Sequence, residues 1–172
     1  MTHPIVNIDE LDPQPLPPQY APHGPAAERY AGRLAAIGPR TGMQQLSGNL
    51  VALAPGFRAF PFHSHRVNEE MFIVLEGTGQ VRIGPETYPI RAGDIIACPA
   101  GGPETAHQLI NTGTTELRYL AFGTTRSPEV AEFPETGKYG VLIRDAQGDG
   151  VSELGLRTMG KLGQKVDYWE GN

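Results

Sequence analysis

Four side chains in this sequence are of types and spacing that could hold a divalent metal ion. His63 and His65 are separated by one residue, so both side chains point to the same face of a strand. Glu70 follows and opens an apolar run, and His107 is the only histidine downstream. Three imidazoles and a carboxylate suit Mn, Fe, Ni or Zn and leave positions open for a ligand. The sequence therefore predicts one divalent metal ion of undetermined identity.

Glu69 is an alternative carboxylate for this site. Along the expected strand Glu70 is in phase with Phe72, whereas Glu69 is in phase with Met71. Glu69 could be a solvated turn residue or a second carboxylate that orients a histidine.

A β-rich scaffold is expected to bring these residues together. The chain has 22 glycines and 16 prolines in 172 residues, which favours short strands joined by tight turns over a helix bundle. From residue 43, apolar segments recur between turn signals such as Pro55-Gly56 and Gly84-Pro85, a spacing typical of a β-sandwich or barrel. Strands are expected at 46–53, 57–65, 71–75, 80–83, 87–90, 95–98, 106–111, 116–122 and 139–143.

Both ends of the chain differ from this central part, 43–125. Residues 1–42 begin with a proline-rich stretch that predicts an extended arm, either poorly ordered or laid across its own barrel or a partner subunit. Within it, residues 25–37 could form a short helix, which Gly32 weakens. Residues 126–172 are expected to add one strand and a tail that packs on the barrel, because the tail carries the only tryptophan.

Composition excludes several classes of protein. The net charge is −5, without a block of lysine or arginine, so nucleic acid and anionic membranes are poor partners. No apolar run approaches the ~20 residues of a membrane span, and the N-terminus lacks the regions of a signal peptide. The single cysteine, Cys98, excludes an internal disulfide and favours a cytoplasmic location. Cys98 is expected to be buried and inert, since no histidine or cation is evidently beside it.

Two motifs in the central part resemble those of the cupins, small jelly-roll β-barrels. The glycines, histidines and glutamate of the first motif are Gly56, His63, His65, Glu70 and Gly77. The corresponding residues of the second motif are Gly93, Pro99, Gly101, His107 and Asn111. The chain departs from the motifs by one extra residue after Gly56 and by a longer loop, 102–106, before His107.

The resemblance implies an all-β fold, a single-domain cupin jelly roll with an extended N-terminal arm, that forms a homodimer. It selects Glu70 over Glu69 as the metal ligand beside His63, His65 and His107. Asn111 could hydrogen-bond inside the barrel, but a turn-holding role is expected. Cupins include isomerases, dioxygenases, decarboxylases and non-catalytic binders, and the branch that this chain looks like is often labelled sugar-phosphate isomerase. The expected function is therefore metal-dependent action on a small oxygenated molecule, or else binding or sensing of a small ligand.

A general acid or base is not identified by the sequence. The polar candidates near the expected strands are Gln45, Arg58, Gln108, Arg118 and Tyr119. If Arg58 or Arg118 faced inward, the site would favour an anionic substrate such as a sugar phosphate or a carboxylic acid.

Overall fold

The structure, a computed structural model, describes residues 3–144 and 154–171. Its strands are β1 (Gln14–Pro15), β2 (Gly32–Ala36), β3 (Leu46–Leu53), β4 (Ser64–His65), β5 (Glu70–Glu76), β6 (Thr78–Ile83), β7 (Glu86–Arg91), β8 (Ile95–Cys98), β9 (His107–Ile110), β10 (Leu117–Thr124), β11 (Glu129–Phe133), β12 (Lys138–Arg144) and β13 (Leu154–Lys161). Its helical elements are η1 (Ile8–Glu10), η2 (Gly24–Ala26), α1 (Gly38–Thr41) and η3 (Pro103–Thr105). None of these helices is long and apolar enough to cross a membrane.

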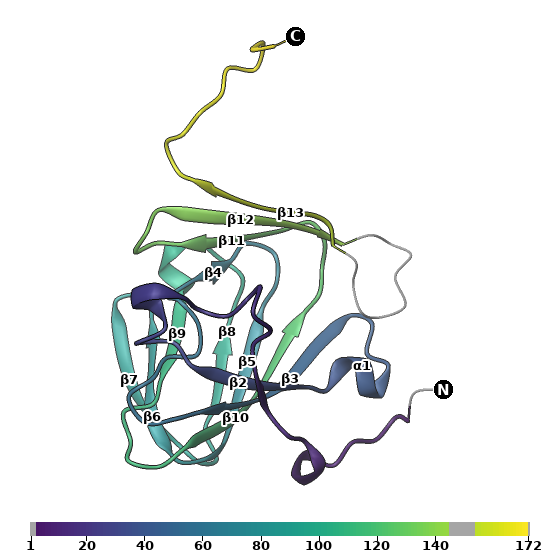
Figure 1. Cartoon of the computed structure of the whole chain (residues 1–172), viewed down its shortest axis with the longest axis vertical. Coiled ribbons are helices and arrows are strands. Elements are labelled where there is room, and N and C mark those ends of the chain that lie inside the picture. The colour runs from purple at the N-terminus through teal and green to yellow at the C-terminus, as the bar shows by residue number, and fades with distance from the viewer. Residues whose placement is uncertain (1–2, 145–153, 172) are drawn as a thin grey trace.

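The strands form three antiparallel sheets (Figure 1). Six strands pair in the order β1-β2-β3-β10-β5-β8, four in the order β13-β12-β11-β4, and three in the order β7-β6-β9. The all-β class predicted from the sequence is confirmed. The sheets do not close into one hydrogen-bonded barrel, contrary to the β-barrel prediction. Segment 55–63 meets β9 through isolated bridges only, and Pro61 within it has no amide to donate to a ladder.

The core lies between the sheets and follows from alternation along the strands. On β5, Phe72 and Val74 point inward and are 5% and 1% exposed, whereas Met71, which points to the opposite face of the sheet, is 39% exposed. Glu70 is in phase with the inward residues, so the strand that fills the core also presents a carboxylate at its first position. Gly77 then lets the chain turn into β6 at φ 81°, where a Cβ would overlap the carbonyl oxygen of Glu116.

The N-terminal region contributes a strand where a helix was predicted. Residues 25–37 are not one helix: η2 ends at Ala26, and Gly32–Ala36 form β2, which pairs with β3. Local helix propensity is overridden because Leu34 and Ala35 complete the packing over β3. Earlier in the chain, Leu11 is buried in one hydrophobic cluster with Ala35 and Leu50, so the segment around Leu11 lies against the sheet.

The C-terminal region also differs from its prediction. It contributes β11, β12 and β13, of which only β12 was expected. The tail after β13 runs away from the sheets (Figure 1), and Tyr168 and Trp169 are 81% and 74% exposed. The two aromatic rings contact each other at a centroid distance of 4.8 Å, and the described residues leave most of both side chains exposed, contrary to the predicted packing on the body.

Candidate metal centre

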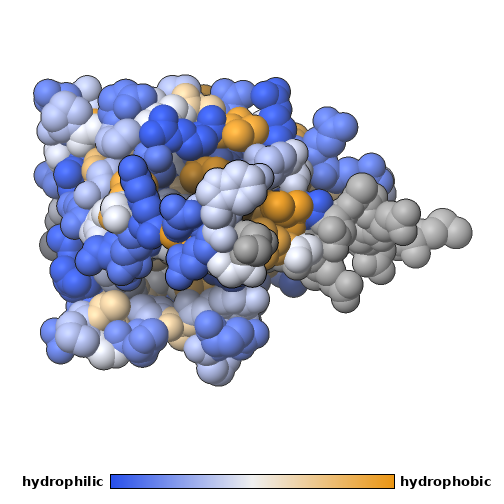
Figure 2. Space-filling model, turned by 90° about the horizontal axis from the view of Figure 1, so that it is seen from above, coloured by the Kyte–Doolittle hydropathy of each residue, from blue (hydrophilic) through white to orange (hydrophobic). Residues whose placement is uncertain are grey.

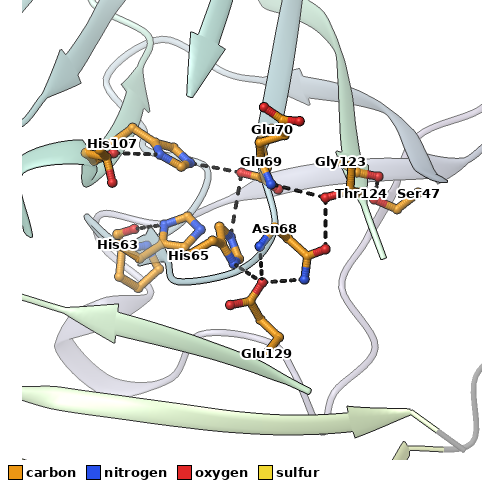
Figure 3. Close-up of polar contacts among 12 residues, drawn as sticks. Ser47, His63, His65, Asn68, Glu69, Glu70, His107, Gly123, Thr124 and Glu129 are labelled. Carbon is orange, nitrogen blue, oxygen red and sulfur yellow. Dashed lines mark hydrogen bonds and ion pairs between the residues drawn. The ribbon is translucent and has the colours of Figure 1, made fainter. Parts of the chain in front are cut away.

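The four predicted residues lie together at one end of the core. His63 precedes β4, His65 ends it, Glu70 begins β5 and His107 begins β9. One ligand atom from each residue lies within 4.8 Å of the others, which would allow a single ion to be held. Figure 3 shows the three rings and the Glu70 carboxylate facing a common point.

Backbone hydrogen bonds fix the spacing of the histidines. The amide of His107 donates to the carbonyl of His63 at 2.8 Å, and the amide of His63 donates back to His107 at 3.2 Å. The amide of Gly101 donates to the carbonyl of His65 at 2.8 Å. The longer loop before His107 is therefore tied to the strand that carries His65, and its extra residues form the turn η3 without displacing His107.

The outer nitrogens of the rings are held by the surrounding chain. His63 Nδ1 lies 2.8 Å from the carbonyl oxygen of Pro61, and His107 Nδ1 lies 3.3 Å from that of Thr105. A carbonyl can only accept, so each contact favours a proton on Nδ1 and makes Nε2 the nitrogen that would bind a metal. In His107 that nitrogen faces the Glu70 carboxylate and would first have to lose its proton. His107 Nε2 lies 2.9 Å from Glu70 Oε2, and His65 Nε2 lies 3.8 Å from the same oxygen.

The electrostatics of the cluster are those of a cation site. Burial, assisted by His107, lowers the pKa of His63 to about 4, which keeps this ring neutral at physiological pH. Burial also lowers the pKa of His107, but bonds to Cys98 and Glu70 outweigh it and raise the pKa to about 10. Burial raises the pKa of Glu70, but the His107 hydrogen bond and the nearby imidazoles lower it overall. The His107–Glu70 pair thus holds a proton that a divalent cation would replace.

The residues fit a divalent first-row metal. The donors are imidazole nitrogens and a carboxylate oxygen, the set that Mn, Fe, Ni and Zn share. Moreover, His65 Nδ1 is buried without a hydrogen-bond partner among the described residues, which is uncommon in a native protein. A metal held by this cluster would supply a positive charge and an open position for an oxygen ligand.

The sequence analysis missed Glu129, a carboxylate that lies behind the cluster of four residues. It comes from β11, is 6% exposed, and its Oε2 lies 3.7 Å from His65 Nδ1. Its oxygens accept from the amides of Val67, Asn68 and Val130 at 3.1, 2.7 and 2.8 Å, and from the Asn68 side chain. Glu129 therefore anchors the turn between His65 and Glu70 (Figure 3). Its carboxylate also lies beside a histidine, the place that the sequence analysis considered for Glu69.

Other residues singled out in the sequence have different places. Glu69 is exposed, and its backbone amide donates to Thr124 Oγ1. Asn111 is fully buried and bonds to the backbone of Leu53, Gly113 and Thr115, which confirms its turn-holding role. Cys98 is buried as predicted, but a histidine is near it after all, since Cys98 contributes to the raised pKa of His107.

A cavity of about 240 Å³ adjoins the four residues. Its walls are mainly apolar and include Leu34, Val51, Phe60, Phe72 and Leu109. Of the five polar candidates from the sequence, Gln108 and Tyr119 line it. Gln45 is exposed, and Arg118 bonds to Glu76 at 3.1 Å. The cavity is smaller than the roughly 300–1,000 Å³ of pockets for drug-sized ligands, so it suits a small molecule.

Comparison with known proteins identifies the domain. The family model described as the cupin domain matches residues 49–123. Over 58 residues the chain is 34% identical to an uncharacterized protein of Methanocaldococcus jannaschii, covering 34% of this chain and 44% of that protein. Over 69 residues it is 33% identical to the oxalate-binding protein of Thermotoga maritima, covering 40% and 54%. These matches span about half the length of each curated relative.

Solved structures extend the likeness of the fold beyond the matched domain. A sugar phosphate isomerase of the cupin superfamily from Silicibacter pomeroyi superposes with a TM-score of 0.75 at 23% identity, covering 96% of this chain and 98% of that one. A protein of Thermotoga maritima described as a predicted oxalate decarboxylase has a TM-score of 0.55 at 22% identity, covering 71% and 99%. At these identities the likeness shows the fold alone. Sequence motifs, sheets and family match agree: residues 49–123 of this chain form a cupin domain.

Proposed function

We propose that the chain binds one divalent metal ion through His63, His65, Glu70 and His107 and acts on a small oxygenated molecule in the adjoining cavity. The observation that carries the proposal is the convergence of four metal-ligand atoms within 4.8 Å on the wall of that cavity. The metal would supply Lewis acidity toward a ligand oxygen, and the apolar walls would exclude water around it.

Two reactions fit this description. Isomerisation of a sugar phosphate, the activity in the name of the Silicibacter pomeroyi protein, needs a base that moves a proton. A dioxygenase reaction needs a redox-active metal and oxygen. Consumption of oxygen during turnover would separate the two.

A binding or sensing protein without catalysis is the second candidate. One observation favours it: among the described residues that line the cavity, the titratable groups are the four proposed metal ligands and Tyr119. Burial raises the pKa of the Tyr119 phenol above its ordinary value, so this group donates a hydrogen bond and is a poor base. The oxalate-binding protein of Thermotoga maritima is a relative whose name describes binding.

The chain is also proposed to act as a homodimer in a reducing, cytoplasmic environment. Exposed apolar side chains on β13 and the tail, including Leu156 and Met159, support association with a second copy. The single, buried cysteine supports the reducing environment. Light scattering coupled to gel filtration tests the dimer.

Metal content measured by elemental analysis tests the main proposal. The parent protein, free of any affinity tag, should hold close to one ion per chain, and the His63→Ala/His65→Ala variant should hold none. The matched control is His3→Ala/His23→Ala, which removes two exposed histidines and should keep the metal. A parent that refuses added Mn, Fe, Ni and Zn would overturn the proposal.

A further inference from the structure

Two polar side chains in the cavity have no hydrogen-bond partner in the protein. Tyr119 is 1% exposed and lines the cavity together with Asn49. Within residues 3–144 and 154–171, no hydrogen bond involves the Tyr119 hydroxyl or the Asn49 side-chain amide. Asn49 is partly exposed and Tyr119 is buried, and both line the cavity, so their polar groups are available to a ligand bound there.

Packing holds both groups on one wall. Tyr119 on β10 pairs with Val51 on β3, and two residues along the ladder Ala121 pairs with Asn49. Phe72 meets the Tyr119 ring edge-on at 5.8 Å and the His107 ring at 5.6 Å, so one phenylalanine locates both the phenol and a proposed metal ligand. A ligand bound beside the metal ligands would thus meet a phenol held by ring packing, with the Asn49 amide nearby on the neighbouring strand.

The charge around the cavity limits which ligand fits. Among the described residues that line it there is no lysine or arginine. Arg66 follows His65, and Arg82 pairs with Gln108, but their guanidinium groups are bound to Glu132 and Glu135. Arg58 and Arg118 are not among the lining residues. A phosphate group here would lack the arginine or lysine contact that usually neutralises it.

The net charge of the metal-loaded site narrows the class of ligand further. Three neutral imidazoles, one carboxylate and a divalent ion carry a net charge of +1, which one carboxylate of a ligand neutralises. A phosphate monoester, with close to two negative charges at pH 7, would leave excess negative charge among apolar walls, which is unfavourable.

We propose that the ligand is a small monocarboxylate with a neighbouring hydroxyl or oxo oxygen, that Tyr119 and Asn49 hydrogen-bond to it, and that phosphate esters are rejected. The inference rests on the proposed function, because the ion provides the positive charge. It names a 2-hydroxy or 2-oxo acid as the substrate or ligand class of the same site, and of the two reactions considered above it excludes the isomerisation of a sugar phosphate.

Calorimetric titration of the manganese-loaded protein tests the class. Lactate and 2-oxobutanoate should bind at least roughly tenfold more tightly than 2-phosphoglycolate and dihydroxyacetone phosphate. Equal or tighter binding of the phosphate esters, or no binding of either acid, would overturn the inference while leaving the metal site intact. A protein that does not load manganese or any other divalent metal would instead overturn the proposed function, and this inference with it.

Two tyrosine variants test the role of the phenol. Tyr119→Phe removes the hydroxyl and keeps the ring against Phe72, so metal content should be unchanged and affinity for the acids should fall roughly tenfold. Tyr88→Phe, at a half-exposed position on β7, is the matched control and should bind as the parent does. Unchanged affinity in Tyr119→Phe would remove the phenol from the proposal.

Discussion

The metal centre and the C-terminal segment break the usual separation of polar and apolar groups in opposite ways. At the centre, polar side chains are buried: His107 is 2% exposed and Glu129 is 6% exposed. In the C-terminal segment, apolar side chains are exposed: Leu162 is 60% and Val166 82% exposed. Figure 2, a view from above, shows hydrophobic residues exposed among hydrophilic ones on this side of the molecule.

The two regions differ in what offsets the unfavourable free energy of burying polar groups or exposing apolar ones. Burial of polar groups is unfavourable unless each finds a partner. At the centre the chain supplies nearly all the partners itself, and an ion would complete the set. The exposed side chains of β13, an edge strand of its sheet, and of the tail have no such compensation among the described residues of one chain. The buried polar groups of the centre agree with the proposed metal ion, and the exposed apolar side chains of the C-terminal segment agree with the proposed second copy of the chain.

Adjacent glutamates give the sharpest test of the centre. Glu70→Gln should lower metal affinity on the order of 100-fold or more, because it removes the carboxylate that faces three imidazoles. Glu69→Gln, one residue away and exposed, should have no measurable effect. Competition with a fluorescent chelator would measure both. Equal losses in the two variants would contradict the assignment of Glu70.

Glu129 should matter less than Glu70 but more than a surface carboxylate. Glu129→Gln should weaken metal binding by about 10- to 100-fold, because the turn between His65 and Glu70 loses part of its anchor. Glu132→Gln, on the same strand and paired with Arg66, is the control and should bind metal as the parent does. Chelator competition, repeated on Glu129→Asp to test partial rescue, would show whether the carboxylate itself is needed.

Metal affinity should rise with pH. The raised pKa of His107 means that its proton is present at pH 7 and leaves when a cation binds. About one proton should be released per ion, so the association constant should rise roughly tenfold per pH unit between pH 6.5 and 8. Titration calorimetry in two buffers with different ionisation enthalpies would count the protons. Release of no proton on metal binding would contradict the proton shared by His107 and Glu70.

The C-terminal segment should be dispensable for the centre. Deleting residues 162–172 should leave metal content unchanged and reduce the mass in solution from two chains to one. Light scattering and elemental analysis on the same sample would check both outcomes. A truncated chain that remains dimeric would place the interface elsewhere, and one that loses metal would show that the two regions are coupled.

The ligand set could be predicted from the sequence because the spacing of these residues and the resemblance to the cupin motifs point to the same four side chains. His63, His65 and Glu70 lie close in sequence, and alternation along a strand decides which of two glutamates points inward. Glu129 could not be predicted in the same way, because it reaches the site only through the pairing of β11 with β4. Its sole signal is an inward phase with Ala131, which many strand residues share.

The predictions about the fold that differ from the structure have a similar origin. β2 was predicted as part of a helix because Ala-rich residues favour helices locally, whereas pairing with β3 decides the outcome. The tail was expected to pack on the body because it carries Trp169, but the described chain offers it no site, and the residue type does not indicate which chain would cover it. Long-range pairing and association are the two properties that local pattern does not encode.

The reciprocal backbone bridge between His63 and His107 has a consequence for how the chain folds. It joins two segments that are far apart in sequence, and the loops that separate them must close before the bridge can form. Contacts of this kind are slow to establish. The ability to capture a metal ion should therefore be gained late in folding, after the three-stranded sheet has reached the segment before β4. A metal-sensitive dye added during refolding would measure the rate at which metal binding appears in this last step.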